Sequence, residues 1–155
     1  MQKDEIISRI ALACRAIETL EKKEKIYLDL LQSPSNNHPG ETIFNATLGM
    51  QSLRHAMFAV RERIVERALE HHNLINSLRT IDEGLAKSNN FVFAHMMLKR
   101  MEQLQYEVNE YDAQKGVVLE GNKDHAKKNR ELIAKIKCVY DPPEPRPKSR
   151  FWRRK

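Results

Sequence analysis

Glycine and proline are scarce in this chain, with five and six residues among 155. Sheet sandwiches and barrels need more turn residues and β-branched runs than this, so the composition favours helices and we expect no sheet. No stretch approaches the roughly 18 to 20 consecutive apolar residues of a membrane-spanning helix. The first ten residues carry four charges and no apolar segment, so we predict neither a signal peptide nor a transmembrane segment.

Signature motifs of enzymes are also missing. The chain has no glycine-rich phosphate loop, no G-x-G-x-x-G, no H-E-x-x-H and no G-x-S-x-G. Its two cysteines, Cys14 and Cys138, have neither the CxxC spacing of a redox pair nor the Cys/His spacing of a zinc site. We therefore predict a non-enzymatic protein of the reducing cytoplasm, with no metal and no cofactor.

What the chain does have is a long apolar stripe between residues 43 and 85. Its positions follow one another at spacings of three and four, which places them on one side of a helix. Eleven of the thirteen are apolar, so this helix requires partner helices. The stripe consists of Ile43, Ala46, Met50, Leu53, Met57, Val60, Ile64, Arg67, His71, Leu74, Leu78, Ile81 and Leu85.

Periodicity and turn residues predict four helices. The first runs from about residue 4 to 32, with an apolar ladder interrupted at Glu24, and ends before Pro34. The second covers about 41–87, and at this length it either projects from the domain as a coiled-coil arm or bends. Ser88, Asn89 and Asn90 are predicted to end it and to cap a third helix from about Phe91 to Tyr111. A break near Gly121 precedes a short helix over 123–138.

The adjacent histidines of the second helix admit two interpretations. His71 and His72 point about 100° apart on a helix, so they are poorly placed to chelate one ion together. We interpret His71 as a polar position in the apolar stripe, which can fix helix register or face solvent. Near the start of the third helix, Phe91 and Phe93 present apolar surface in two directions, which indicates that part of this chain or another one covers it.

Positive charge is concentrated at the C-terminal end. Residues 1–120 have 15 Lys and Arg against 17 Asp and Glu, whereas residues 121–155 have 12 against 4. Such polarity is typical of proteins that bind an anionic partner, most often nucleic acid. On the last helix, the cations fall in one stripe opposite Leu132, Ile136 and Val139, so one face can dock while the other remains cationic.

The final segment combines prolines, cations and two aromatic rings. Pro142, Pro143, Pro145 and Pro147 exclude regular helix and favour a polyproline-like spacer, and we predict that the tail is disordered on its own. Cations bind phosphates and Trp152 can stack on a base. The predicted nucleic-acid-binding residues are Lys123, Lys127, Arg130, Lys137, Arg146, Lys148, Arg150, Trp152, Arg153, Arg154 and Lys155.

The sequence thus predicts an all-α fold: an elongated antiparallel bundle or coiled-coil hairpin of three long helices, a short basic helix and a disordered tail. Residues 1–139 form the bundle and 140–155 the tail. The predicted function is that of an accessory protein that binds nucleic acid, DNA rather than RNA, together with a larger protein complex, and that can self-associate. Factors of DNA replication or helicase loading in bacteria or phages have this general character. A stalk or chaperone of a secretion or motor apparatus and a peripheral membrane adaptor are the alternatives.

Overall fold

The computed structural model describes residues 2–32, 43–113 and 120–140, and every regular element in these ranges is an α-helix. The helices are α1 (Lys3–Gln32), α2 (Ile43–Arg79), α3 (Glu83–Ala113) and α4 (Glu120–Val139). The predicted all-α class is confirmed. In this part of the chain, no helix is both long enough and apolar enough to span a bilayer. From residue 141 on, the predicted tail lies outside the described ranges.

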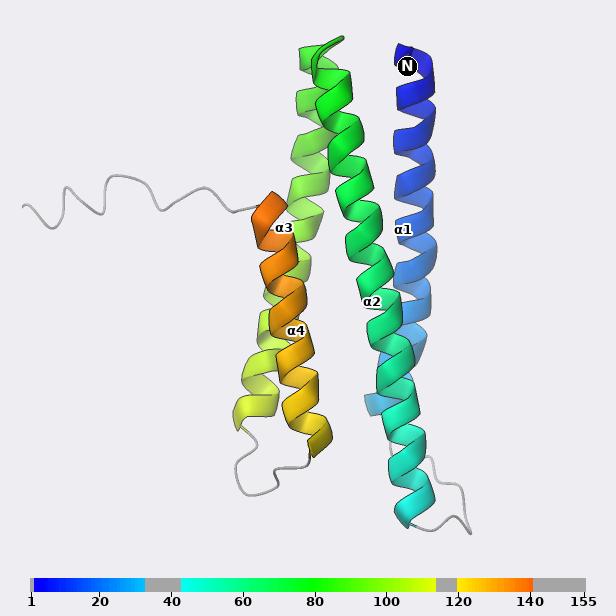
Figure 1. The fold of residues 1–155 in the computed structure, drawn as a ribbon, viewed down its shortest axis with the longest axis vertical. Coiled ribbons are helices and arrows are strands. Elements are labelled where there is room, and N and C mark those ends of the chain that lie inside the picture. Colours follow the sequence, from blue (N-terminus) through cyan, green and yellow to red (C-terminus); the bar gives the residue numbers. More distant parts are fainter. Residues whose placement is uncertain (1, 33–42, 114–119, 141–155) are drawn as a thin grey trace, which may run out of the picture.

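Successive helices run in opposite directions, and α2 lies at the centre (Figure 1). It packs along α1 and also contacts α3 and α4, while α3 and α4 form a second antiparallel pair. The shortest helix, α4, accompanies only the part of α3 that is distant from the α2–α3 turn. Its end lies level with Phe93, because the ring of Tyr140, directly after α4, is centred 5.8 Å from the ring of Phe93.

The predicted apolar faces form the core. The stripe of the third helix is buried at Met97, Met101, Leu104 and Val108, as expected, and the ladder of α1 is buried at both of its ends. One cluster joins all four helices through the middle of the bundle. A second cluster, at the tip, packs the start of α1 against the end of α2 and the start of α3. In the 43–85 stripe, the side chains of residues 43 and 46 lie outside the described part.

The predicted boundary between the second and third helices is wrong. The chain turns at residues 80–82, although the apolar spacing of three and four continues through these positions. Ile81, a member of the stripe, is 49% exposed at the turn. Ser88 and Asn89 cap nothing: the Ser88 hydroxyl donates to the carbonyl of Gly84 and the Asn89 amide to that of Leu85, one turn earlier in α3. Polar side chains that bond back to the preceding turn are compatible with a helix interior.

Two further expectations need correction. Gly121, predicted as a break, lies inside the first turn of α4. Arg67, predicted as a polar position of the stripe, is at the surface and pairs with Glu70 three residues on. His71 does lie in the core, with 1% of its surface exposed.

Asp82 is the residue that starts α3. Its carboxylate accepts a hydrogen bond from the backbone N–H of Leu85 at 3.0 Å, the geometry of an N-cap, and it also pairs with Lys3 of α1 at 2.9 Å. We expect Asp82→Ala to lower the melting temperature, because the cap and the link to α1 are both lost. Asp82→Asn keeps a capping oxygen and should retain more than half of the lost stability. Equal melting temperatures of Asp82→Ala and the parent would contradict this role.

Candidate nucleic-acid interface

The last helix has the two faces predicted for it. Leu132 and Ile136 are buried and Val139 is half-buried, so this side docks on the bundle. The four predicted cations of α4 are exposed along the opposite side, and we call them the cationic row: Lys123, Lys127, Arg130 and Lys137. Fourteen residues separate its ends, which at about 1.5 Å of rise per residue makes the row roughly 21 Å long.

Most of the charge of this row is not neutralised within the described residues. Arg130 forms an ion pair with Asp112 near the end of α3, and both side chains are about half exposed. Within the described ranges, no carboxylate lies within ion-pair distance of Lys123, Lys127 or Lys137. Three lysines therefore present full positive charge to solvent.

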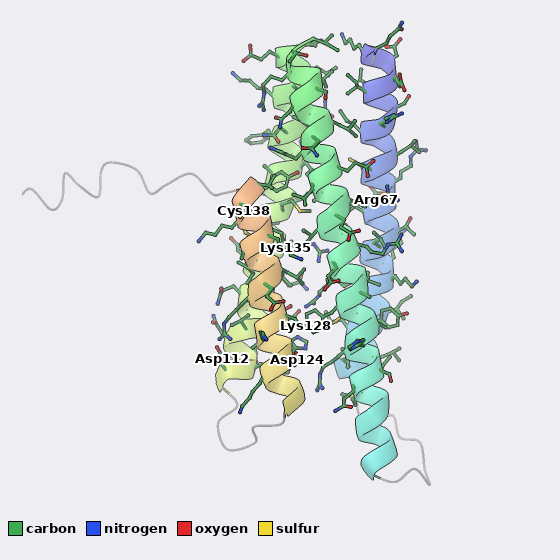
Figure 2. The ribbon with its side chains drawn as sticks, in the orientation of Figure 1. Arg67, Asp112, Asp124, Lys128, Lys135 and Cys138 are labelled. Atoms are coloured by element: carbon green, nitrogen blue, oxygen red, sulfur yellow. The ribbon has the colours of Figure 1, made fainter. Side chains whose placement is uncertain are left out.

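A second row of charges on α4 was missed from the sequence. Asp124, Lys128, Glu131 and Lys135 lie beside the cationic row, and opposite charges stand four residues apart (Figure 2). At this spacing the charges face one another along a helix and largely balance. The ammonium of Lys128 also lies 5.7 Å from the centre of the Phe58 ring of α2. The cationic row thus differs from its neighbour in having no acidic member.

Polar groups on the inner side fix the position of α4. The amide of Asn129 donates to Glu107 of α3 at 3.1 Å, and His125 Nε2 lies 2.8 Å from the same carboxylate. The imidazole of His125 is stacked on Tyr111, with 4.0 Å between ring centres. At the end of the helix, the Tyr140 hydroxyl donates to the carbonyl of Ala68 in α2 at 2.9 Å. The cationic row is therefore carried by a helix that is anchored at both ends.

The charges beneath α4 form a buried network around Arg61 of α2, whose surface is 1% exposed. Its Nε donates to Glu24 of α1 at 2.7 Å, and its two Nη groups donate to both carboxylate oxygens of Glu107 at 2.9 and 2.7 Å. The side-chain oxygen of Asn129 accepts a further bond at 2.7 Å. One guanidinium thus joins α1, α3 and α4 to α2.

A second arginine extends this network. Arg100 of α3 donates to both oxygens of Glu24 at 2.8 and 3.0 Å and to Glu21 at 2.9 Å. Burial alone would raise the pKa of Glu107, but hydrogen bonds from His125 and Arg61 outweigh burial and lower the pKa to about 2. Both central carboxylates are thus ionised and paired inside the bundle.

Sequence patterns gave only a partial sign of this network. Glu24 interrupts the apolar ladder of the first helix at a position that faces the core, which signals a buried partner. Arg61 gave no signal, because it lies one residue away from the apolar stripe beside Val60. An arginine such as Arg61 can be assigned to the core only when the carboxylates of other helices are known to pair with it.

The histidine pair of α2 has structural contacts. His71 is stacked on Phe93 with 3.7 Å between ring centres, and burial, followed by the nearby His72, lowers its pKa to about 4. The ring of His72 meets the edge of Tyr140 at 5.6 Å. Among the described residues, no three His, Cys, Asp or Glu side chains are grouped as they would be around a metal ion.

The remaining predicted site residues lie outside the described ranges. They are Arg146, Lys148, Arg150, Trp152, Arg153, Arg154 and Lys155. Comparisons of the chain with protein-family models, with curated proteins and with solved structures found no match.

Proposed function

We propose that this chain is a non-enzymatic accessory protein that binds nucleic acid through the cationic row of α4 and the basic residues 146–155. The elongated antiparallel bundle serves as its scaffold. The observation that carries the proposal is the exposure of Lys123, Lys127 and Lys137 on an anchored helix, with no carboxylate partner among the described residues. The buried arginines of the bundle, Arg61 and Arg100, are matched by carboxylates, whereas the row of α4 is a stripe of exposed cations with no acidic member.

A row of this length suits a phosphate backbone. Cations spaced over roughly 21 Å on a straight helix can neutralise several successive phosphates, and the counterions released supply the free energy of binding. Such contacts position a protein without reading sequence. Trp152 adds a ring that can stack on an unpaired base. We expect DNA to be bound in preference to RNA, with little sequence preference.

An accessory role also requires protein contacts. Large apolar side chains remain exposed on the outer side of α1, at Leu12, Ile26 and Leu30, and they offer surface to a larger complex or to a second copy of the chain. We place the protein among factors of DNA replication, such as helicase loaders of bacteria or phages. Cytoplasmic location is part of this proposal.

The salt dependence of binding tests the proposal. If about six phosphates are neutralised, affinity for duplex DNA should fall about a thousandfold between about 50 and 200 mM salt. We expect the triple variant Lys123→Gln, Lys127→Gln, Lys137→Gln to bind more weakly and to reduce the slope of log K against log salt by about 2 to 3. Fluorescence anisotropy of a labelled oligonucleotide measures both quantities.

A matched control separates the row from overall charge. Lys22, Lys23 and Lys25 are exposed on α1, and their replacement by glutamine removes the same net charge from another face. This variant should bind DNA nearly as the parent does. If both triple variants lose the same affinity for DNA, binding depends on overall charge and not on the cationic row. If the protein binds neither DNA nor RNA at low salt but does bind anionic vesicles, the nucleic-acid proposal is wrong and the chain is a peripheral membrane adaptor.

A further inference from the structure

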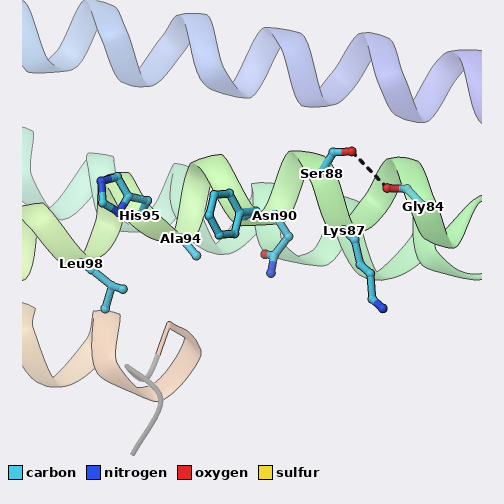
Figure 3. Close-up of a pocket in the computed structure, with 8 residues that line it drawn as sticks. Gly84, Lys87, Ser88, Asn90, Ala94, His95 and Leu98 are labelled. Atoms are coloured by element: carbon cyan, nitrogen blue, oxygen red, sulfur yellow. Dashed lines mark hydrogen bonds between the residues drawn. The ribbon is translucent and has the colours of Figure 1, made fainter. Parts of the chain in front are cut away.

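An apolar groove runs along α3 beyond the end of α4. It has a volume of about 660 Å³, and all of its lining residues within the described ranges belong to α3, with Phe91, Ala94 and Leu98 as the apolar ones and Lys87 on the rim (Figure 3). The ring of Phe91 is 76% exposed, a large apolar area for a side chain in the middle of a helix. Because α4 is short, no other helix of the described ranges covers this face of α3.

The groove continues down to α4. A second hollow, of about 310 Å³, is lined by Leu98 and Met101 of α3 and by Ile133 and Lys137 of α4. Leu98 lines both hollows, so they meet where α4 ends. The described chain also ends there, with Tyr140 anchored to Ala68. Whatever follows Tyr140 starts at the mouth of the groove.

Length and conformation match the next seven residues, 141–147, to this groove. Four of the seven are prolines, which favour a polyproline II helix of about 3.1 Å per residue and hence about 22 Å in total. From Phe93, which is level with Tyr140, back to Gly84, the nine residues of α3 span about 14 Å at 1.5 Å each, so seven extended residues are long enough to cover this part of the groove. Since α4 runs antiparallel to α3, the C-terminal end of α4 points toward the start of α3, where Gly84 lies.

Charge fits the same arrangement. A polyproline II helix has three residues per turn, so Asp141 and Glu144 share one edge while Pro142 and Pro145 share another. The acidic edge can meet Lys87, the cation that lines the groove. Such a helix has no internal hydrogen bonds, and exposed aromatic surface is what proline-rich segments bind in other proteins.

We propose that residues 141–147 dock in the α3 groove as a polyproline strap, with proline rings against Phe91 and Ala94. The basic residues that follow then emerge near the α2–α3 turn, beyond the end of the cationic row. The strap is independent of what the basic end binds.

An indole introduced at position 91 tests the strap directly. Trp152 is the only tryptophan of the chain, so the Trp152→Phe, Phe91→Trp variant reports on the groove alone. We compare this variant with the same variant truncated after Tyr140. In the full-length protein, we expect the Trp emission to lie further to the blue and its quenching by acrylamide to be severalfold weaker. The control is Tyr106→Trp in the Trp152→Phe background, since Tyr106 is 65% exposed on α3 outside the groove and should not respond to truncation.

Three outcomes of the fluorescence experiment decide whether residues 141–147 occupy the groove. Equal quenching at position 91 with and without residues 141–155 overturns the strap. Protection that persists in the truncated chain and grows with protein concentration assigns the groove to a second copy instead. Protection that is lost on truncation and also on Pro142→Gly with Pro145→Gly supports the strap. DNA binding, measured on the same proteins, is a separate readout, so the strap and the proposed function can fail independently.

Discussion

Replacement of Arg61 by leucine is expected to lower the free energy of unfolding by about 3 to 5 kcal/mol, the usual cost of breaking a buried ion pair. The variant leaves Glu107 without its two guanidinium bonds and removes one of the two arginines bound to Glu24. A buried carboxylate without a partner must either remain charged in an apolar medium or take up a proton. Urea denaturation followed by far-ultraviolet circular dichroism measures the change.

Arg67 supplies the matched control on the same helix. Its pair with Glu70 lies at the surface, with 42% of the arginine side chain exposed. Arg67→Leu should therefore change the free energy of unfolding by only about 0 to 1 kcal/mol. If both variants lose the same small amount, the buried network contributes no more than a surface pair and its stabilising role is excluded.

Acid is expected to destabilise the bundle in two stages. The unfolded chain protonates His71 near pH 6.5, whereas the folded chain keeps it neutral down to about pH 4. The unfolded state binds more protons in this window, so stability falls as the pH falls, by about 3 kcal/mol over the whole window. Glu107 acts below it: its folded pKa of about 2 lies under its ordinary value of 4.5, so its contribution is complete above pH 4.5 and is lost toward pH 2.

His71→Leu separates the two stages. Leucine fills the site beside Phe93 but does not titrate, so the fall in stability between about pH 6.5 and 4.5, measured by urea denaturation, should become clearly shallower. Part of this fall remains because burial also lowers the pKa of His72 and of His125, and the loss below pH 4.5 remains as well. His95→Leu, on the exposed side of α3, should leave the parent's pH dependence in place. An unchanged pH profile in His71→Leu would mean that the buried imidazole is not the group that titrates.

Local patterns predicted much of the fold. Apolar residues at spacings of three and four identified α1 to within a residue at its start, together with the core face of α3. They also oriented α4, because Leu132 and Ile136 point away from the cationic row. Each of these features depends on residues close together in one helix.

The α2–α3 turn shows where that reasoning fails. Leu78 at the end of α2 and Leu85 at the start of α3 both face the core, and their separation of seven positions equals about two helical turns. Periodicity alone cannot distinguish a straight helix from a sharp turn of this length. Asp82 was the available signal, since aspartate before a run of helix formers is a typical N-cap.

Spacing indicated a buried partner for Glu24 but could not predict which residues form the interior network. Glu24 and Arg61 are 37 positions apart, and Arg61 and Asn129 are 68 apart. Their meeting depends on how four helices pack, which no single stripe reveals. The same holds for the surface beside the cationic row, where Lys128 becomes a neighbour of Phe58 in α2 only in the folded chain.

Because Glu24 accepts from arginines of two different helices, α1 cannot shift along its neighbours without losing both contacts at once. A slide of one turn, about 5.4 Å, would place an apolar or exposed position against two guanidinium groups. The bundle should therefore behave as a stiff rod, in which a force applied to the tip near Lys3 moves α4 as a body instead of being absorbed by slippage between helices.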